Sequence, residues 1–234
     1  MGIRQAIDAH RSQHDRCAGT LYWQLNDCWP VASWSSIDYT GRWKALHYRL
    51  REAFANVAVT VHVNDNQSIV FYLVNDSLSS VKGMLKITAM ALDGSKSQVL
   101  TRKQVSVVPD NSKLVATCNS AELKGLRADQ VCLVAQFEHD GKVLAEQVCF
   151  FVKPGQLKLQ RNEIRQDLKC FGDHFELTLT CPTFCYGVQV METMGKEVRW
   201  SDNYFNLLPN VPKTIYGYYD QMDGEPVVSV RSWK

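Results

Sequence analysis

The chain has 234 residues, of which 45% are hydrophobic and 21% are charged, and its formal net charge is +2. These values are ordinary for a globular protein of one to three domains, and the balanced charge argues against a nucleic-acid-binding surface. No run of about 18 apolar residues occurs, so we expect no membrane span. The N-terminus has neither the apolar core of a signal peptide nor the Ser or Thr that N-myristoylation requires at position 6.

Cysteine and histidine usage argues against a disulfide scaffold and against a metal site. The chain holds eight cysteines, far fewer than a disulfide-stapled protein of this length would carry. Cys181 and Cys185 are four residues apart, but no Cys or His pair lies at the spacing that zinc requires. His10 and His14 fall on one face of a predicted helix without a third ligand. We therefore expect mostly free thiols, no metal and no cofactor.

The first 56 residues are predicted to form a helix, a strand and a second helix. Residues 3–14 have apolar side chains at three- and four-residue spacing, and no capping residue precedes them, so this helix is already under way at Ile3. Residues 20–25 are predicted to form a short buried strand, and residues 41–54 a helix. One strand cannot close a sheet. Residues 1–56 are therefore interpreted as the end of a (β/α)8 barrel, a fold of roughly 250 residues.

Aromatic and amide side chains are concentrated in residues 19–30, GTLYWQLNDCWP. In a (β/α)8 barrel the active site lies at the carboxyl ends of the strands. Sugars are bound by aromatic rings against their C–H faces and by amides or carboxylates on their hydroxyls. The side chains with this chemistry are Trp23, Gln24, Asn26, Asp27 and Trp29. The alternative interpretation is structural, with a buried pair of tryptophans and a turn at Asn26 and Asp27.

From Val57 onward the hydrophobic period changes to two, which is typical of strands. Strand candidates separated by turn signals such as Asp93-Gly94 predict an antiparallel β-sandwich over residues 57–153. Residues 153–156, KPGQ, are a candidate linker, and a second strand series predicts a smaller sandwich over residues 154–234, with residues 157–167 as an additional edge strand. The predicted fold is mainly β, with the end of a barrel before two Ig-like antiparallel sandwiches.

Two motifs connect this organisation with a known family. Residues 19–48, GTLYWQLNDCWPVASWSSIDYTGRWKALHY, resemble the eighth strand, loop and helix of the β-mannosidases of glycoside hydrolase family 2. Residues 200–215, WSDNYFNLLPNVPKTI, resemble the signature of the last Ig-like domain of that family. The two motifs occur in the expected order and bracket nearly the whole chain.

The resemblance implies an enzyme that removes terminal, non-reducing β-D-mannose with retention of configuration, using one Glu as acid/base and a second as nucleophile. In the family these residues follow the fourth and seventh barrel strands, so both would lie outside this chain. Trp23 would be the aromatic platform of the mannose subsite, and Asn26, Asp27 and Trp29 would line or shape its pocket. The direction of Gln24 stays open, because one strand does not show which of its faces points inward.

Further expectations accompany this interpretation. An accessory unit that binds glycans through its sandwiches is the non-catalytic alternative, and an exo-β-glucosaminidase is an alternative parent enzyme. Residues 1–56 are expected to be the least stable part of the isolated chain, or to self-associate. In the second motif, Asp202 and Asn203 are assigned to a turn. Its core residues are expected to be Tyr204, Phe205 and Leu208.

Overall fold

The computed structural model describes residues 2–64, 66, 68–161, 163–194, 197–219 and 226–233. The chain forms two compact units, one from Met1–Ala91 with Lys96–Lys158 and the other from Leu92–Ser95 with Leu159–Lys234. Most regular structure is strand, so the predicted mainly β character is confirmed. Within the described ranges no helix is long and apolar enough to cross a membrane.

Helices α1 and α2 precede the first sandwich. α1 (Gly2–Ser12) agrees with the helix predicted over residues 3–14. α2 (Ala45–Ala53) is shorter than the predicted 41–54, because Gly41 has a left-handed φ of 88° and Lys44 is extended, so the helix begins only at Ala45. Ile7 of α1 packs with Leu50 and Ala53 of α2 in a small apolar cluster.

The predicted strand over residues 20–25 is wrong. These residues form no ladder with any described strand, and the backbone between the helices makes isolated bridges, one of them between Asn26 and Ile37. A strand exists only where a neighbour supplies hydrogen bonds along its edge, and the sequence pattern of one segment cannot supply that neighbour. Instead, the Leu25 carbonyl accepts hydrogen bonds from the amides of Ser36 and Ile37.

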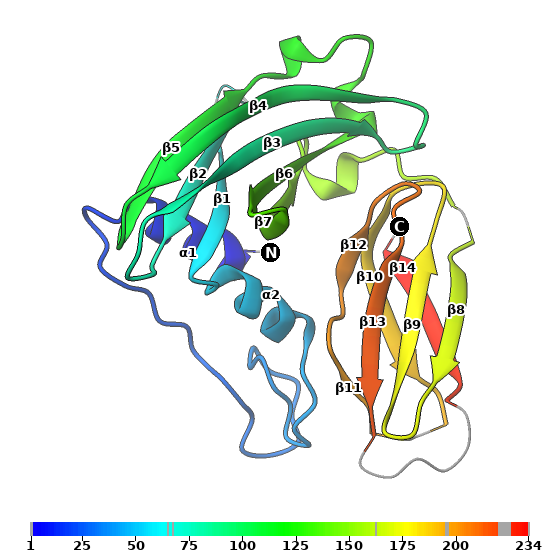
Figure 1. The fold of residues 1–234 in the computed structure, drawn as a ribbon. Coiled ribbons are helices and arrows are strands. Elements are labelled where there is room, and N and C mark those ends of the chain that lie inside the picture. Colours follow the sequence, from blue (N-terminus) through cyan, green and yellow to red (C-terminus); the bar gives the residue numbers. More distant parts are fainter. Residues whose placement is uncertain are drawn as a thin grey trace. The chain divides into compact units, whose positions relative to one another are not determined.

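The first sandwich consists of antiparallel strands in two sheets, as the period-two pattern predicts. One sheet has the order β1–β2–β5 and the other the order β4–β3–β6–β7 (Figure 1). In chain order the strands are β1 (Val57–Val63), β2 (Ile69–Asn75), β3 (Val81–Ala91), β4 (Ser97–Val107), β5 (Asn111–Cys118), β6 (Val131–His139) and β7 (Lys142–Cys149). Alternate residues of β3, such as Leu85 and Ile87, are fully buried in the core between the sheets.

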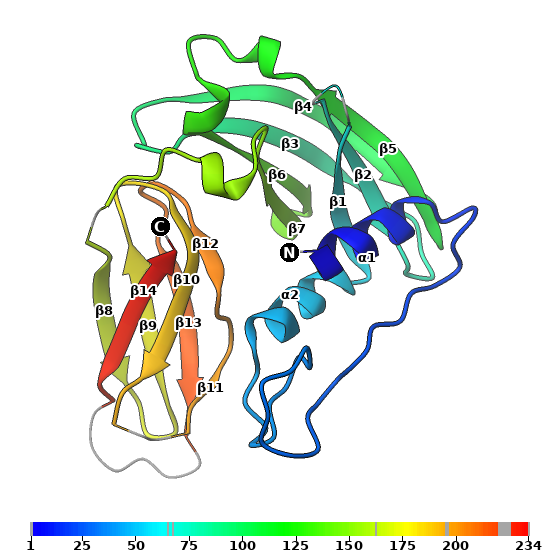
Figure 2. The same cartoon turned by 180° about the vertical axis from the view of Figure 1, so that it is seen from behind.

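Helix α1 lies on the outer face of the β1–β2–β5 sheet (Figure 2). The hydroxyl of Ser12, the last residue of the helix, contacts His62 of β1. Ser112 of β5 donates a hydrogen bond of 2.8 Å to the Ser12 carbonyl. The end of α1 is therefore attached to both edge strands of this sheet, β1 and β5.

Two largely buried arginines of α1 extend this attachment. Arg11 donates hydrogen bonds to the Ala53 carbonyl at the end of α2 and, at 2.8 Å, to the carboxylate of Asp76 after β2. Arg4 donates a hydrogen bond of 3.0 Å to the side chain of Gln147 on β7. The helical N-terminal part and the first sandwich therefore form one compact unit.

The second sandwich has one sheet with the order β12–β10–β14 and another with the order β11–β13–β9–β8. Its strands are β8 (Arg165–Cys170), β9 (His174–Thr180), β10 (Cys185–Glu192), β11 (Arg199–Trp200), β12 (Phe205–Leu207), β13 (Lys213–Tyr218) and β14 (Val228–Trp233). The predicted edge strand exists as β8, but it lies at 165–170 and not at 157–167. The reason is its register, which pairs Arg165 with Thr180 and Cys170 with Phe175 of β9.

Residues 200–215, the second motif, contain a buried asparagine that is hydrogen-bonded to β10, and the short strand β12. Asn203 is buried, and its side-chain amide exchanges two hydrogen bonds of 2.8 Å with the backbone of Val190. Phe205 is buried as predicted, while Tyr204 is half-buried. Leu207, and not Leu208, is the leucine in the core, because β12 places Phe205 and Leu207 on the same face.

Candidate functional site

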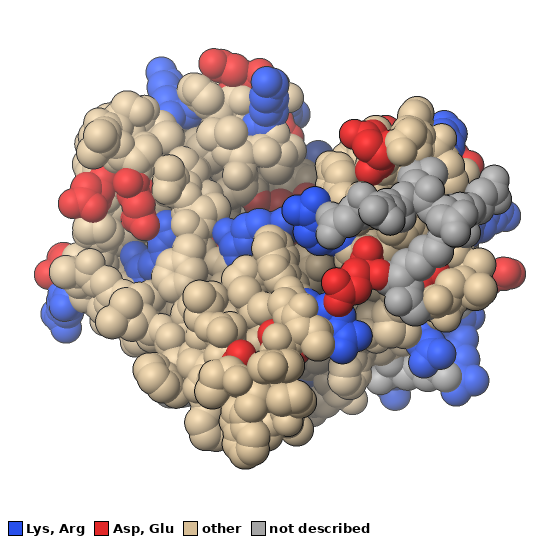
Figure 3. Space-filling view, turned by 90° about the horizontal axis from the view of Figure 1, so that it is seen from below, with Lys and Arg blue, Asp and Glu red and all other residues tan. Residues whose placement is uncertain are grey.

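The candidate site lies in the connection between α1 and α2. Between Cys17 and Trp43 the residues of the Lys, Arg, Asp and Glu types are Asp27, Asp38 and Arg42 alone. The space-filling view from below shows a broad area without charged side chains (Figure 3). The connection exposes large apolar side chains instead, namely Leu21, Trp23, Leu25, Trp29, Trp34 and Tyr39.

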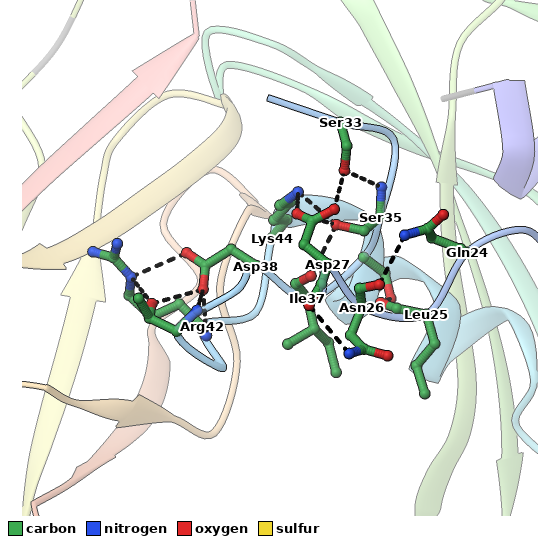
Figure 4. Close-up of polar contacts among 12 residues, drawn as sticks. Gln24, Leu25, Asn26, Asp27, Ser33, Ser35, Ile37, Asp38, Arg42 and Lys44 are labelled. Carbon is green, nitrogen blue, oxygen red and sulfur yellow. Dashed lines mark hydrogen bonds and ion pairs between the residues drawn. The ribbon is translucent and has the colours of Figure 1, made fainter. Parts of the chain in front are cut away.

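Asp27 is the centre of a buried hydrogen-bond network that shapes this loop (Figure 4). Its carboxylate accepts hydrogen bonds from the Ser33 hydroxyl, from the Ser35 hydroxyl at 2.7 Å and from the Lys44 ammonium at 2.9 Å. The hydrogen bonds from Ser33, Lys44 and Ser35 lower the pKa of Asp27 to about 2. Because Lys44 directly precedes α2, the network ties the middle of the loop to the start of the helix. Both oxygens of Asp27 are thereby occupied inside the loop.

A second group of contacts holds the base of the loop. The Ser36 hydroxyl lies 2.9 Å from the Tyr22 hydroxyl and 3.0 Å from Nδ1 of His47 on α2. Burial, and then the charge of Arg51, lowers the pKa of His47, so its ring is neutral at pH 7. The His47 ring also packs against Trp43, with ring centroids 4.3 Å apart. Tyr22, just before the predicted site residues, is therefore fixed to α2.

Gln24 and Asn26 lie next to the Asp27 network (Figure 4). The Gln24 amide donates a hydrogen bond of 2.9 Å to the Asn26 carbonyl, so the side chain of Gln24 folds back along the loop. The Asn26 amide donates a long hydrogen bond of 3.3 Å to the Asp27 carbonyl, and Asn26 is exposed. Asn26 is thus the exposed amide of the site, and Gln24 supports the loop backbone.

Trp23 and Trp29 are both exposed to solvent, by 78% and 64%. The peptide bond between Trp23 and Gln24 is cis. The interpretation of the two tryptophans as a buried structural pair is therefore wrong. Their rings make no contact with each other in the described part of the chain, so any ligand would meet them as separate surfaces.

Sequence reasoning missed the residues that hold the loop in place, Ser33, Ser35, Ser36 and Lys44. The serines of residues 19–48 were a possible signal, because a buried carboxylate needs hydrogen-bond donors and serine hydroxyls often supply them. The sequence did not show which carboxylate they would meet, because the loop between Asp27 and Lys44 follows no regular period.

The carboxylates of the loop are taken up by internal hydrogen bonds. Asp27 is saturated by hydrogen bonds, and Asp38 accepts hydrogen bonds of 2.9 Å from the amides of Thr40 and Arg42. The exposed groups include aromatic rings and the Asn26 amide, which can pack against the C–H faces and bind the hydroxyls of a sugar. Among the residues that the structure describes, no group of three or more His, Cys, Asp or Glu side chains could hold a metal ion.

Two family models match the β part of the chain. The Mannosidase Ig/CBM-like domain matches residues 67–154, and an Ig-fold domain matches residues 159–232. β-Mannosidase A of Aspergillus flavus is 38% identical over 82 residues, which are 35% of this chain and 9% of that protein. β-Mannosidase A of Aspergillus fumigatus is 26% identical over 215 residues, which are 86% of this chain and 23% of that protein. The chain therefore spans less than a quarter of the length of these relatives.

The fold is also shared with a solved structure. The crystal structure of the β-D-mannosidase from Dictyoglomus thermophilum matches 99% of this chain and 28% of its own chain, with a TM-score of 0.82 and 20% sequence identity. The fold likeness thus includes the helical N-terminal part as well as the sandwiches. Together with the two family models and the related sequences, it shows that the chain carries two Ig-like domains of the mannosidase type and is similar to the C-terminal portion of β-mannosidases.

Proposed function

We propose that the chain is the C-terminal part of a retaining exo-β-D-mannosidase, which hydrolyses terminal, non-reducing β-D-mannose residues in β-mannosides. The names of its relatives and its family models support a glycoside hydrolase. The observation that carries the assignment of the site is the exposure of the Trp23 and Trp29 rings beside the Asn26 amide, on a loop that buried Asp27 holds in shape.

Each residue of the loop has a separate role in this proposal. Trp23 is the platform for the C–H face of the mannose ring, and Asn26 binds a mannose hydroxyl. Trp29 borders the pocket. Asp27 acts through the loop backbone, because its oxygens already accept hydrogen bonds from Ser33, Ser35 and Lys44. Residues 1–56 belong to the end of the catalytic barrel, to which they contribute α1, α2 and the loop between them.

The catalytic carboxylates belong to the preceding part of the barrel. Retaining glycosidases need two carboxyl groups about 5–5.5 Å apart, one as acid/base and one as nucleophile. The two carboxylates of the loop, Asp27 and Asp38, are both held by internal hydrogen bonds. This chain therefore supplies part of the substrate pocket, and the acid and the nucleophile come from elsewhere.

The test is a pair of tryptophan variants in the full-length protein that contains this chain. Trp23→Ala should lower kcat/KM for an aryl β-D-mannoside roughly tenfold to hundredfold, the loss expected for a central aromatic contact. Trp34→Ala is the matched control, since Trp34 is 67% exposed in the same loop and has no assigned role. Equal kcat/KM for Trp23→Ala and the wild type would contradict the platform role. Higher activity on an aryl β-D-glucosaminide than on the mannoside would identify the sister enzyme as the parent.

A further inference from the structure

A second aromatic surface lies in the other compact unit, on the outer face of the sheet β11–β13–β9–β8. Side chains alternate between the two faces of a strand. Ile215 and Phe175 are buried in the core, so Tyr216 and Tyr218 of β13 share the opposite face with His174 of β9. β13 and β9 lie side by side in this sheet (Figure 1). The register places Tyr218 directly opposite His174.

The rings form one continuous surface, which we call the aromatic face (Phe171, His174, Tyr216 and Tyr218). Phe171 stacks on His174, with centroids 4.8 Å apart and planes inclined by 11°. The His174 ring lies 6.1 Å from the Tyr216 ring and 6.0 Å from the Tyr218 ring. Phe171, Tyr216 and Tyr218 are 43%, 37% and 40% exposed, so each ring is seated on the sheet and still presents a free side.

The aromatic face is held in place from below and from its edge. Gly217 lies between the two tyrosines, and a Cβ there would come within 2.1 Å of the Phe175 ring, so this core ring packs directly under the backbone of β13. At the edge, Nδ1 of His174 lies 2.7 Å from Oδ1 of Asp173, and the His174 ring stacks on Phe171. A ligand would therefore meet rings whose positions are already set, and little conformational entropy would be lost on binding.

The charges around the aromatic face are nearly balanced. Lys169 of β8 lies opposite Glu176 of β9 and 3.8 Å from Asp167, and Arg199 of β11 lies opposite Tyr218. With Asp173, these side chains give two positive and three negative charges. A surface with so small a net charge has little attraction for a charged polymer. It does offer hydrogen-bonding groups on both sides of the rings, and this combination matches a neutral ligand rich in hydroxyls.

We propose that the aromatic face is a binding site for a neutral, β-linked oligosaccharide chain, distinct from the mannose site of the N-terminal loop. The rings pack against the C–H faces of successive sugar units, and tyrosine combines such an apolar ring with a polar hydroxyl. Glu176, Lys169 and Arg199 bind the hydroxyls at the rim. Because the sheet surface is open, it accepts an internal stretch of a polysaccharide, whereas an exo-acting pocket accepts a chain end.

The test is native affinity electrophoresis of the 234-residue chain in gels that contain a soluble galactomannan, whose backbone is β-linked mannose. The wild type should be retarded. In the double variant Tyr216→Ala/Tyr218→Ala the apparent affinity should fall about tenfold or more. Trp233→Ala is the matched control, because it removes a ring that is 67% exposed on β14, in the other sheet of the same sandwich, and it should leave retardation unchanged.

The outcome separates this site from the proposed mannose site. Loss of retardation in Trp23→Ala together with normal retardation of the double variant would assign gel binding to the N-terminal loop and overturn the assignment to the aromatic face. Unretarded wild-type protein, or equal retardation of the double variant and the wild type, would overturn it as well.

A measurement on the wild type tests the same site without substitutions, in case the double variant does not fold. During titration of the wild type with mannohexaose, the proton resonances of the His174 ring should shift, while those of His14 in the other unit should not. A face that contacts a protein instead of a glycan would give neither retardation nor this shift, and either absence would refute the proposal.

Discussion

Arg11 is the side chain whose loss should most weaken the attachment of α1 to the first sandwich. Its guanidinium is 7% exposed and donates to the carbonyls of Ala53 and Ala55, the latter at 2.7 Å, and to the carboxylate of Asp76 at 2.8 Å. Each buried acceptor left unsatisfied costs about 1–3 kcal/mol. The Asp76 carboxylate is 40% exposed, so loss of the Arg11–Asp76 ion pair adds only about 0–1 kcal/mol to the decrease in the free energy of unfolding. Arg11→Ala should therefore lower the free energy of unfolding by about 3 kcal/mol.

Urea denaturation followed by far-UV circular dichroism measures this loss, with the two compact units fitted as separate transitions. With an m-value of about 2 kcal/mol/M, the midpoint of the first unit should fall by roughly 1.5 M. Arg16→Ala is the matched control, because the Arg16 side chain is 82% exposed and lies 4.0 Å from Asp15, and its midpoint should stay within roughly 0.3 M of the wild type. Equal midpoints for the two variants would refute the role of Arg11 as an anchor.

Three other measurements address the loop and the activity. The pKa of Asp27 in the folded chain, about 2, lies below its ordinary value of 3.8, so its stabilising effect is complete above about pH 4 and is lost as the pH falls toward 2. Tryptophan fluorescence should show this acid transition, and its persistence in Asp27→Asn would assign it to another group. Amides of residues 18–34 should exchange quickly, since in this range only the Asp27 amide donates to a backbone carbonyl, whereas β3 and β6 should exchange slowly. Uniformly slow exchange in a monomer would contradict this, and slow exchange in a dimer would indicate self-association through residues 1–56. Finally, the isolated chain should not hydrolyse an aryl β-D-mannoside above background, and turnover that disappears when one of its own glutamates is replaced would show that the chain is catalytic.

The strands could be predicted from the sequence because burial on one face imposes a period of two. Residues 57–63, VAVTVHV, and residues 185–192, CYGVQVME, are strand candidates by this period, and they correspond to β1 and β10 residue for residue. The short strands β11 and β12 could not be predicted in this way, because two or three residues do not establish a period. The strand predicted over residues 20–25 failed for another reason. A β-ladder needs a neighbouring strand, and the hydrophobic pattern of residues 20–25 does not show whether a neighbouring strand is present.

The residues of the candidate site that would meet a ligand stay a prediction, and the internal contacts of the loop could not be predicted. Trp23, Asn26 and Trp29 are exposed, as residues that meet a ligand must be. The buried position of Asp27 depends on the path that brings Ser33, Ser35 and Lys44 to its carboxylate, and this path is irregular. The aromatic face was missed because Tyr216 and Tyr218 are far from Phe171 and His174 in the sequence. Only the register between β9 and β13 brings them together.

The turn between β3 and β4 determines which fragments of this protein contain a complete second unit. The turn residues Leu92–Ser95 belong to the second compact unit, although the strands on both sides belong to the first. The Leu92 carbonyl accepts the amide of Phe184 at 2.7 Å, and Gly94, at a φ of 75°, leaves room for the Pro182 carbonyl, which a Cβ would approach to 2.5 Å. A gene segment that encodes residues 159–234 alone would produce a sandwich without this carbonyl. Such a segment would lack part of its own compact unit, and a recombination event at residue 159 would have to carry residues 92–95 along or rebuild the missing turn.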